Sequence, residues 1–104
     1  MDSGILTRGD HVTVDIEQAI TMANREVLGA TLGNVDEKQL IAFSIEVATR
    51  RAAYLKKAMN LSDHSADRVD GEELQTLRLD YEEAKTAFTE LVRAIDRGYL
   101  DIHS

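Results

Sequence analysis

The residues of this 104-residue chain that form a basic cluster, and could together bind an anion, are Arg50, Arg51, Lys56 and Lys57. Guanidinium and ammonium groups hold phosphates and carboxylates, so this cluster could bind nucleic acid or an anionic substrate. Only Tyr54 is interleaved with it, and no glycine-rich phosphate loop is present. We favour a simpler interpretation, in which the cations lie near a helix C-terminus, where the helix dipole favours them, and form ion pairs with acidic residues of another helix.

The histidines His11, His64 and His103 are too far apart in the sequence to share a helical turn. No Glu-x-x-His or His-x-x-x-His pair occurs, which is the spacing that helical zinc and di-iron sites use. The sequence therefore predicts no metal-binding residues and no cofactor.

The segment 63–71 is rich in oxygen ligands and has a loose likeness to a calcium loop. When Gly71 is aligned with the invariant loop glycine, Ala66 and Arg68 fall where carboxylates belong, and Leu77 falls where the bidentate glutamate belongs. We interpret the segment as a polar connection between helices, not as a cation site.

Adjacent carboxylates occur at Glu72-Glu73 and Glu82-Glu83. Neighbouring residues on a helix point about 100° apart, so neither pair can share a proton as catalytic carboxylates do. Glu46 lies four residues before Arg50, the spacing of an ordinary surface ion pair. No Ser-His-Asp arrangement or nucleophile elbow is present. No catalytic residue is predicted.

The composition indicates an all-α protein. Hydrophobic residues make up 43% of the chain and charged residues 30%, and there are six glycines, no proline and no cysteine. A β-sandwich or barrel would need more turn residues, and the lack of cysteine excludes a disulfide framework. The net charge of −7 disfavours binding to nucleic acid or to a membrane surface. With neither a signal peptide nor a long apolar run, we expect a cytoplasmic protein.

The apolar periodicity and the capping residues predict a flexible N-terminal arm over residues 1–13 and a single helical domain over residues 14–104. A first helix is expected over 14–32, ending near Gly33, with Ile16, Ile20, Ala23 and Val27 on one face. A second is expected to run to about Asn60, starting at a capping box formed by Asn34 and Glu37. A third is expected from about Val69 to Gly98. Beyond its end, the apolar residues Tyr99, Leu100 and Ile102 are expected to fold back onto the helices.

The second and third helices carry the clearest periodicity. The second has two apolar rows, interpreted as adjacent: one is Leu40, Phe43, Val47, Tyr54 and Leu61, and the other is Ile41, Ile45, Ala48, Ala52, Leu55 and Met59. The third has an unbroken heptad seam, typical of a coiled coil, with alternating spacings of three and four. We predict that this seam is the interface, formed by Leu74, Leu77, Tyr81, Ala84, Phe88, Leu91 and Ile95.

A short connection would make the two long helices an antiparallel hairpin, with the first helix covering only part of it. The uncovered apolar strip favours completion of the bundle by self-association, most simply as a homodimer. We therefore expect a small helical protein–protein interaction or regulatory module. The alternative is a small helical enzyme with an intersubunit anion-binding site that uses Arg50 and Arg51. A third class, nucleic-acid binding, has the least support.

Overall fold

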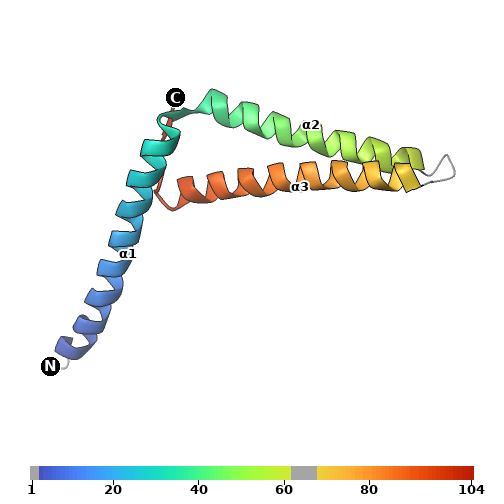
Figure 1. The fold of residues 1–104 in the computed structure, drawn as a ribbon. Coiled ribbons are helices and arrows are strands. Elements are labelled where there is room, and N and C mark those ends of the chain that lie inside the picture. The colour runs from blue at the N-terminus through green and yellow to red at the C-terminus, as the bar shows by residue number, and fades with distance from the viewer. Residues whose placement is uncertain (1–2, 62–67) are drawn as a thin grey trace. The chain divides into compact units, whose positions relative to one another are not determined.

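A computed structural model describes the backbone of residues 3–61 and 68–104, and the side chains of residues 12–61 and 71–104. The elements in chain order are α1 (Ser3–Leu32), β1 (Val35–Asp36), α2 (Glu37–Leu61), α3 (Arg68–Asp96) and β2 (Ile102–His103) (Figure 1). The fold is all-α, as predicted, and the two long helices α2 and α3 pack against each other. The two short strands pair with each other.

The contacts divide the chain into two compact units. The first contains α1, Val35 and residues 94–103, and the second contains α2 and most of α3, over residues 36–93. We describe each unit by itself. The prediction of one domain over residues 14–104 stays a prediction.

Helix α1 begins at Ser3, well before the start predicted at Val14. Gly4, Gly9 and Asp10 and the lack of a helical period favour an arm over residues 1–13, and the flexibility of this segment stays a prediction. Each glycine costs only about 1 kcal/mol relative to alanine, and no proline interrupts the segment. Propagation of an existing helix fixes one residue per added hydrogen bond and is much easier than nucleation, so α1 extends through these positions.

Helix α2 begins with a capping box that lies two residues after the predicted one. The backbone N–H of Gln39 donates to the Asp36 carboxylate at 2.8 Å, and the backbone N–H of Asp36 donates to the Gln39 side-chain oxygen at 2.9 Å. Two donors that the first turn leaves without helical partners are thereby satisfied. The predicted cap, Asn34, lies instead between the end of α1 and β1.

Helix α3 begins at Arg68, close to the predicted start, and Gly98 ends it as predicted. Gly98 has a φ of 77°, and its N–H donates to the carbonyl of Ile95 at 3.0 Å. The N–H of Tyr99 donates to the carbonyl of Ala94 at 2.9 Å. This pair of bonds is a Schellman motif, which turns the chain sharply after the helix.

In the first unit, the segment after this turn packs against α1. Leu100 is 6% exposed and Val35 is 8% exposed, so these two residues form the small core of the unit. Tyr99 lies with Glu17, Ile20 and Thr21 around one shallow depression. The expectation that the apolar C-terminal residues fold back is thus met by Leu100, the most buried hydrophobic residue among those described.

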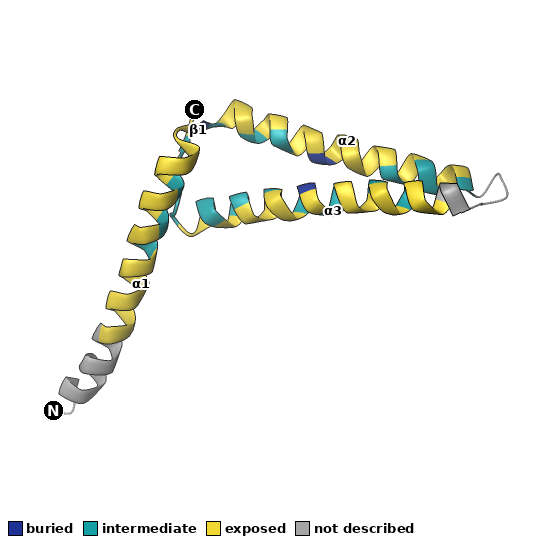
Figure 2. Cartoon of the chain, viewed as in Figure 1, coloured by how far each residue is buried: buried dark blue, intermediate teal, exposed yellow. Residues whose placement is uncertain are grey.

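In the second unit, α2 and α3 lie side by side and run in opposite directions (Figure 1). Phe43 contacts Phe88 and Tyr54 contacts Tyr81, so positions rise along one helix as they fall along the other. Between these aromatic pairs, Val47 on α2 and Ala84 on α3 are buried. In Figure 2, the ribbon of α2 and α3 is coloured as buried on the sides where the two helices face each other.

Candidate functional site

Within the second unit, the α3 seam faces α2 of the same chain at Tyr81 and Phe88. The seven seam residues Leu74, Leu77, Tyr81, Ala84, Phe88, Leu91 and Ile95 are all buried or half-buried. The Phe43 and Phe88 rings meet edge to face, with centroids 5.3 Å apart, and the Tyr54 and Tyr81 rings are stacked at 6.2 Å. Such aromatic pairs are favourable geometries that add to simple apolar burial. At these positions, the seam predicted as the interface is used for packing within the chain.

The facing side of α2 has the same heptad spacing, and two of its positions are basic. This seam contains Leu40, Phe43, Val47, Arg50, Tyr54, Lys57 and Leu61. Apolar periodicity alone does not reveal this heptad, because Arg50 and Lys57 interrupt it. Long cationic side chains can pack their stems against apolar neighbours while the charged ends reach a polar partner.

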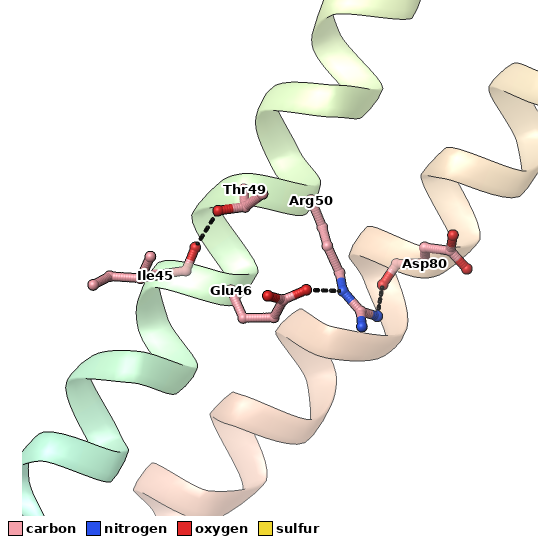
Figure 3. Close-up of polar contacts among 5 residues, drawn as sticks. All are labelled: Ile45, Glu46, Thr49, Arg50 and Asp80. Atoms are coloured by element: carbon pink, nitrogen blue, oxygen red, sulfur yellow. Dashed lines mark hydrogen bonds and ion pairs between the residues drawn. The ribbon is translucent and has the colours of Figure 1, made fainter.

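Arg50 uses its guanidinium within the chain. Its Nε donates to the Glu46 carboxylate at 2.9 Å, the predicted ion pair, and Nη1 donates to the Asp80 carbonyl of α3 at 3.3 Å (Figure 3). Lys57 pairs with Glu73 of α3 at 2.7 Å. Of the basic cluster, Lys57 thus pairs with an acidic residue of another helix, as expected, whereas the acidic partner of Arg50 lies on α2 itself.

Arg51 and Lys85 both lie over the ring of Tyr81. The Arg51 guanidinium carbon is 5.3 Å from the ring centroid, its Nε donates to the Tyr81 hydroxyl at 3.1 Å, and Lys85 Nζ is 5.1 Å from the centroid. Arg51 is therefore a hydrogen-bond partner of the Tyr81 hydroxyl. Glu82, which pairs with Lys85 at 3.1 Å, raises the pKa of Lys85 by hydrogen bonding and by its charge, and Tyr81 adds to the effect.

The other apolar row of α2 stays exposed. We call Ile41, Ile45, Ala48, Ala52, Leu55 and Met59 the outer row. Its four large side chains are 58%, 59%, 49% and 71% exposed in chain order, and both alanines are exposed. Figure 2 shows the exposed side of α2 facing away from α3. Within the second unit, this is the largest set of exposed apolar residues on one helix face among those described.

The interpretation of the two α2 rows as adjacent is corrected by their burial. Val47 is 7% exposed, whereas Ile45 is 59% exposed. With about 100° between successive residues, the mean directions of the two rows lie roughly 135° apart around the helix axis. The rows therefore cannot face one partner together, and a surface that covers the outer row must approach α2 from the side opposite α3.

The first unit holds a separate polar contact between α1 and the C-terminal segment. Arg25 donates to the carbonyl of Gly98 and pairs with Asp101 through Nη2 at 2.9 Å. This hydrogen bond and the opposite charge raise the pKa of Arg25 and lower that of Asp101. The predicted apolar face of α1 is exposed, with Ile16 at 54% and Val27 at 61%.

No metal-binding cluster of three His, Cys, Asp or Glu residues occurs in the part of the chain that the structure describes. His64 and residues 62–67 of the loop compared with a calcium loop lie outside the described residues. His103 lies in β2 and is exposed. Over the described residues, no helix combines the length and apolar character needed to cross a membrane.

Comparisons of the chain with protein-family models, with curated proteins and with solved structures find no match.

Proposed function

We propose that this chain is a protein–protein interaction module that acts through amphipathic helix faces and self-associates, most simply as a homodimer in the cytoplasm. The observation that carries the proposal is the exposed outer row of α2. Its members all lie on one side of a helix whose other side is already packed against α3.

The size of the exposed surface supports this proposal. The four large side chains of the outer row, each about half exposed or more, together present on the order of 400 Å² of apolar surface, a size at which patches are often functional. Burial of apolar surface contributes about 25 cal/mol per Å². Burying the row against a partner would thus contribute favourably to the free energy of association.

The alternative enzyme function has less support. It requires Arg50 and Arg51 to present donors to an anionic substrate, but both side chains already donate to groups of their own chain. Nothing in the described surface gives these two guanidinium groups a common direction toward a ligand.

The proposal is tested by measuring the absolute mass of the full chain by light scattering over a wide range of loading concentrations. We expect a mass of twice 11.6 kDa at high concentration. Ile45→Asp should shift the species to the monomer, since it places a charge in the apolar row. The matched control is Leu79→Asp, at an exposed apolar residue of α3, which should keep the wild-type mass. A folded wild-type monomer at every concentration would contradict self-association.

A further inference from the structure

We infer that the outer row of α2 packs against the outer row of α2 in a second copy of this chain, with the two helices antiparallel and a two-fold axis passing between Ala48 and Ala52. This inference rests on the proposed function and names its partner, its surface and its register.

The outer row is symmetric about its centre. Ala48 and Ala52 lie two residues on either side of position 50, Ile45 and Leu55 lie five, and Ile41 and Met59 lie nine. An isologous interface pairs the same surface of both copies, so that each residue meets its counterpart across the axis. In an antiparallel pair, alanine therefore meets alanine at the centre and large aliphatic residues meet each other on both sides.

The sizes suit two helices that cross closely. Small residues at the crossing point allow the backbones to approach, and interaxial distances of 8–10 Å depend on the side chains found there. Ile41, Ile45, Leu55 and Met59 then extend beyond the crossing and fill the space on either side of it. Arg50, at the centre of the symmetry, is on the opposite side of the helix, where it donates to the Asp80 carbonyl of α3.

Four of the six positions that flank the row are uncharged. On one side they are Ala42, Thr49 and Lys56, and on the other they are Ser44, Arg51 and Ala58. The Arg51 side chain is directed toward α3, because its Nε donates to the Tyr81 hydroxyl at 3.1 Å and its guanidinium lies over the Tyr81 ring.

The charge distribution along α2 favours the antiparallel direction over the parallel one. All four cations of the basic cluster lie between positions 50 and 57, whereas the N-terminal half of the helix carries two acids and one base, Glu37, Glu46 and Lys38. A parallel pair would place the two basic halves side by side. An antiparallel pair places each basic half beside the other copy's N-terminal half, and it also opposes the two helix dipoles favourably.

The area reaches the minimum of a biological interface. Full burial of two outer rows, with their alanines included, would cover on the order of 1,000 Å² in total, which is less than the roughly 1,200–2,000 Å² of stable complexes. The row spans residues 41–59, about 27 Å of helix at the rise of 1.5 Å per residue. A second copy can supply a surface of equal length, because it carries the same row.

The register can be tested by disulfide cross-linking, because the chain has no cysteine of its own. Ile45→Cys and Leu55→Cys are prepared as separate full-length variants, and each is incubated in a glutathione redox buffer alone and mixed with the other. The two positions are ten residues apart, about 15 Å along one helix, whereas a disulfide joins Cα atoms at most about 7 Å apart. Only opposed thiols will therefore cross-link.

We expect cross-linked dimer in the mixture, where about half of the dimers combine one chain of each kind, and little from either variant alone. Leu79→Cys, on the exposed side of α3, is the matched control and should not cross-link with either variant. Circular dichroism checks that all three variants keep the helical content of the wild type.

The outcomes separate this inference from the proposed function. Cross-linking of each variant with itself would indicate a parallel pair and overturn the antiparallel register. A wild-type mass of twice 11.6 kDa without any cross-link at these positions would overturn the outer row as the contact but leave self-association standing. A wild-type monomer would overturn both.

Discussion

At the scale of single residues, Arg25 connects α1 with the segment that follows α3. Its guanidinium reaches both the Gly98 carbonyl and the Asp101 carboxylate, residues more than seventy positions later in the chain. Since Gly98 lies at the turn after α3, this contact helps to keep the C-terminal segment, which includes the buried Leu100, against α1. Sequence periodicity missed Arg25, because polar contacts of such separation leave no spacing pattern.

The Arg25–Asp101 pair predicts a specific dependence on pH. Arg25 lowers the pKa of Asp101 below its ordinary value of 3.8. The ionised carboxylate is favoured in the folded state, so the stabilisation is fully present above 3.8 and is lost as the pH falls through the lowered value. Following the Asp101 carboxyl carbon by NMR should show this low pKa, and Arg25→Ala should raise it toward 3.8. An unchanged titration in the variant would show that the pair does not persist in solution.

At the scale of helices and turns, the end of α3 depends on one backbone conformation. Gly98 has a φ of 77°, whereas Gly71 lies within α3, and a Cβ at Gly71 would meet nothing within 4 Å. We expect Gly98→Ala to lower the free energy of unfolding by about 1 kcal/mol, because the left-handed region is strained for alanine. Gly71→Ala should raise it by about 0.5–1 kcal/mol, since alanine favours the helix. Denaturant unfolding of both variants measures the contrast, and equal shifts would contradict this assignment of the turn.

The packing of α3 on α2 predicts which substitutions in α3 destabilise the fold. Phe88 meets Phe43 edge to face at 5.3 Å, whereas Leu79 on the same helix is 47% exposed. We expect Phe88→Asp to reduce the free energy of unfolding by about 2–4 kcal/mol, because it removes this contact and places a charge in the seam. Leu79→Asp is the control and should change stability by less than about 1 kcal/mol. Similar losses in thermal unfolding for both variants would defeat the assignment of Phe88 to the packed side.

The sequence could predict the three helices and the packed side of α3, but not the start of α1, the two short strands or what each face contacts. An unbroken heptad identifies Tyr81 and Phe88 as members of one face, and the structure places α2 against them. The choice between the Asn34 and Asp36 capping boxes could not be made from spacing, because both match the pattern. It follows from β1, which pairs with β2 from the far end of the chain. Long-range pairing of this kind leaves no local signal.

At the scale of the whole molecule, the balance between apolar surface and net charge determines how two copies would meet. Each chain carries a formal charge of −7, so two chains repel each other at long range. The outer row of α2, in contrast, offers apolar attraction that depends little on salt. The repulsion is screened by salt, since the Debye length falls from about 10 Å at 0.1 M to about 3 Å at 1 M.

This balance predicts that salt strengthens self-association. We expect the dimer dissociation constant, measured by analytical ultracentrifugation, to decrease about three- to tenfold when sodium chloride is raised from about 0.05 M to about 0.5 M, because screening removes repulsion while the apolar contact stays. A contact held mainly by ion pairs would respond in the opposite direction, since salt weakens exposed pairs. Weaker association at high salt would therefore reject the apolar outer row as the main contact and direct attention to charged surfaces such as the basic residues of α2.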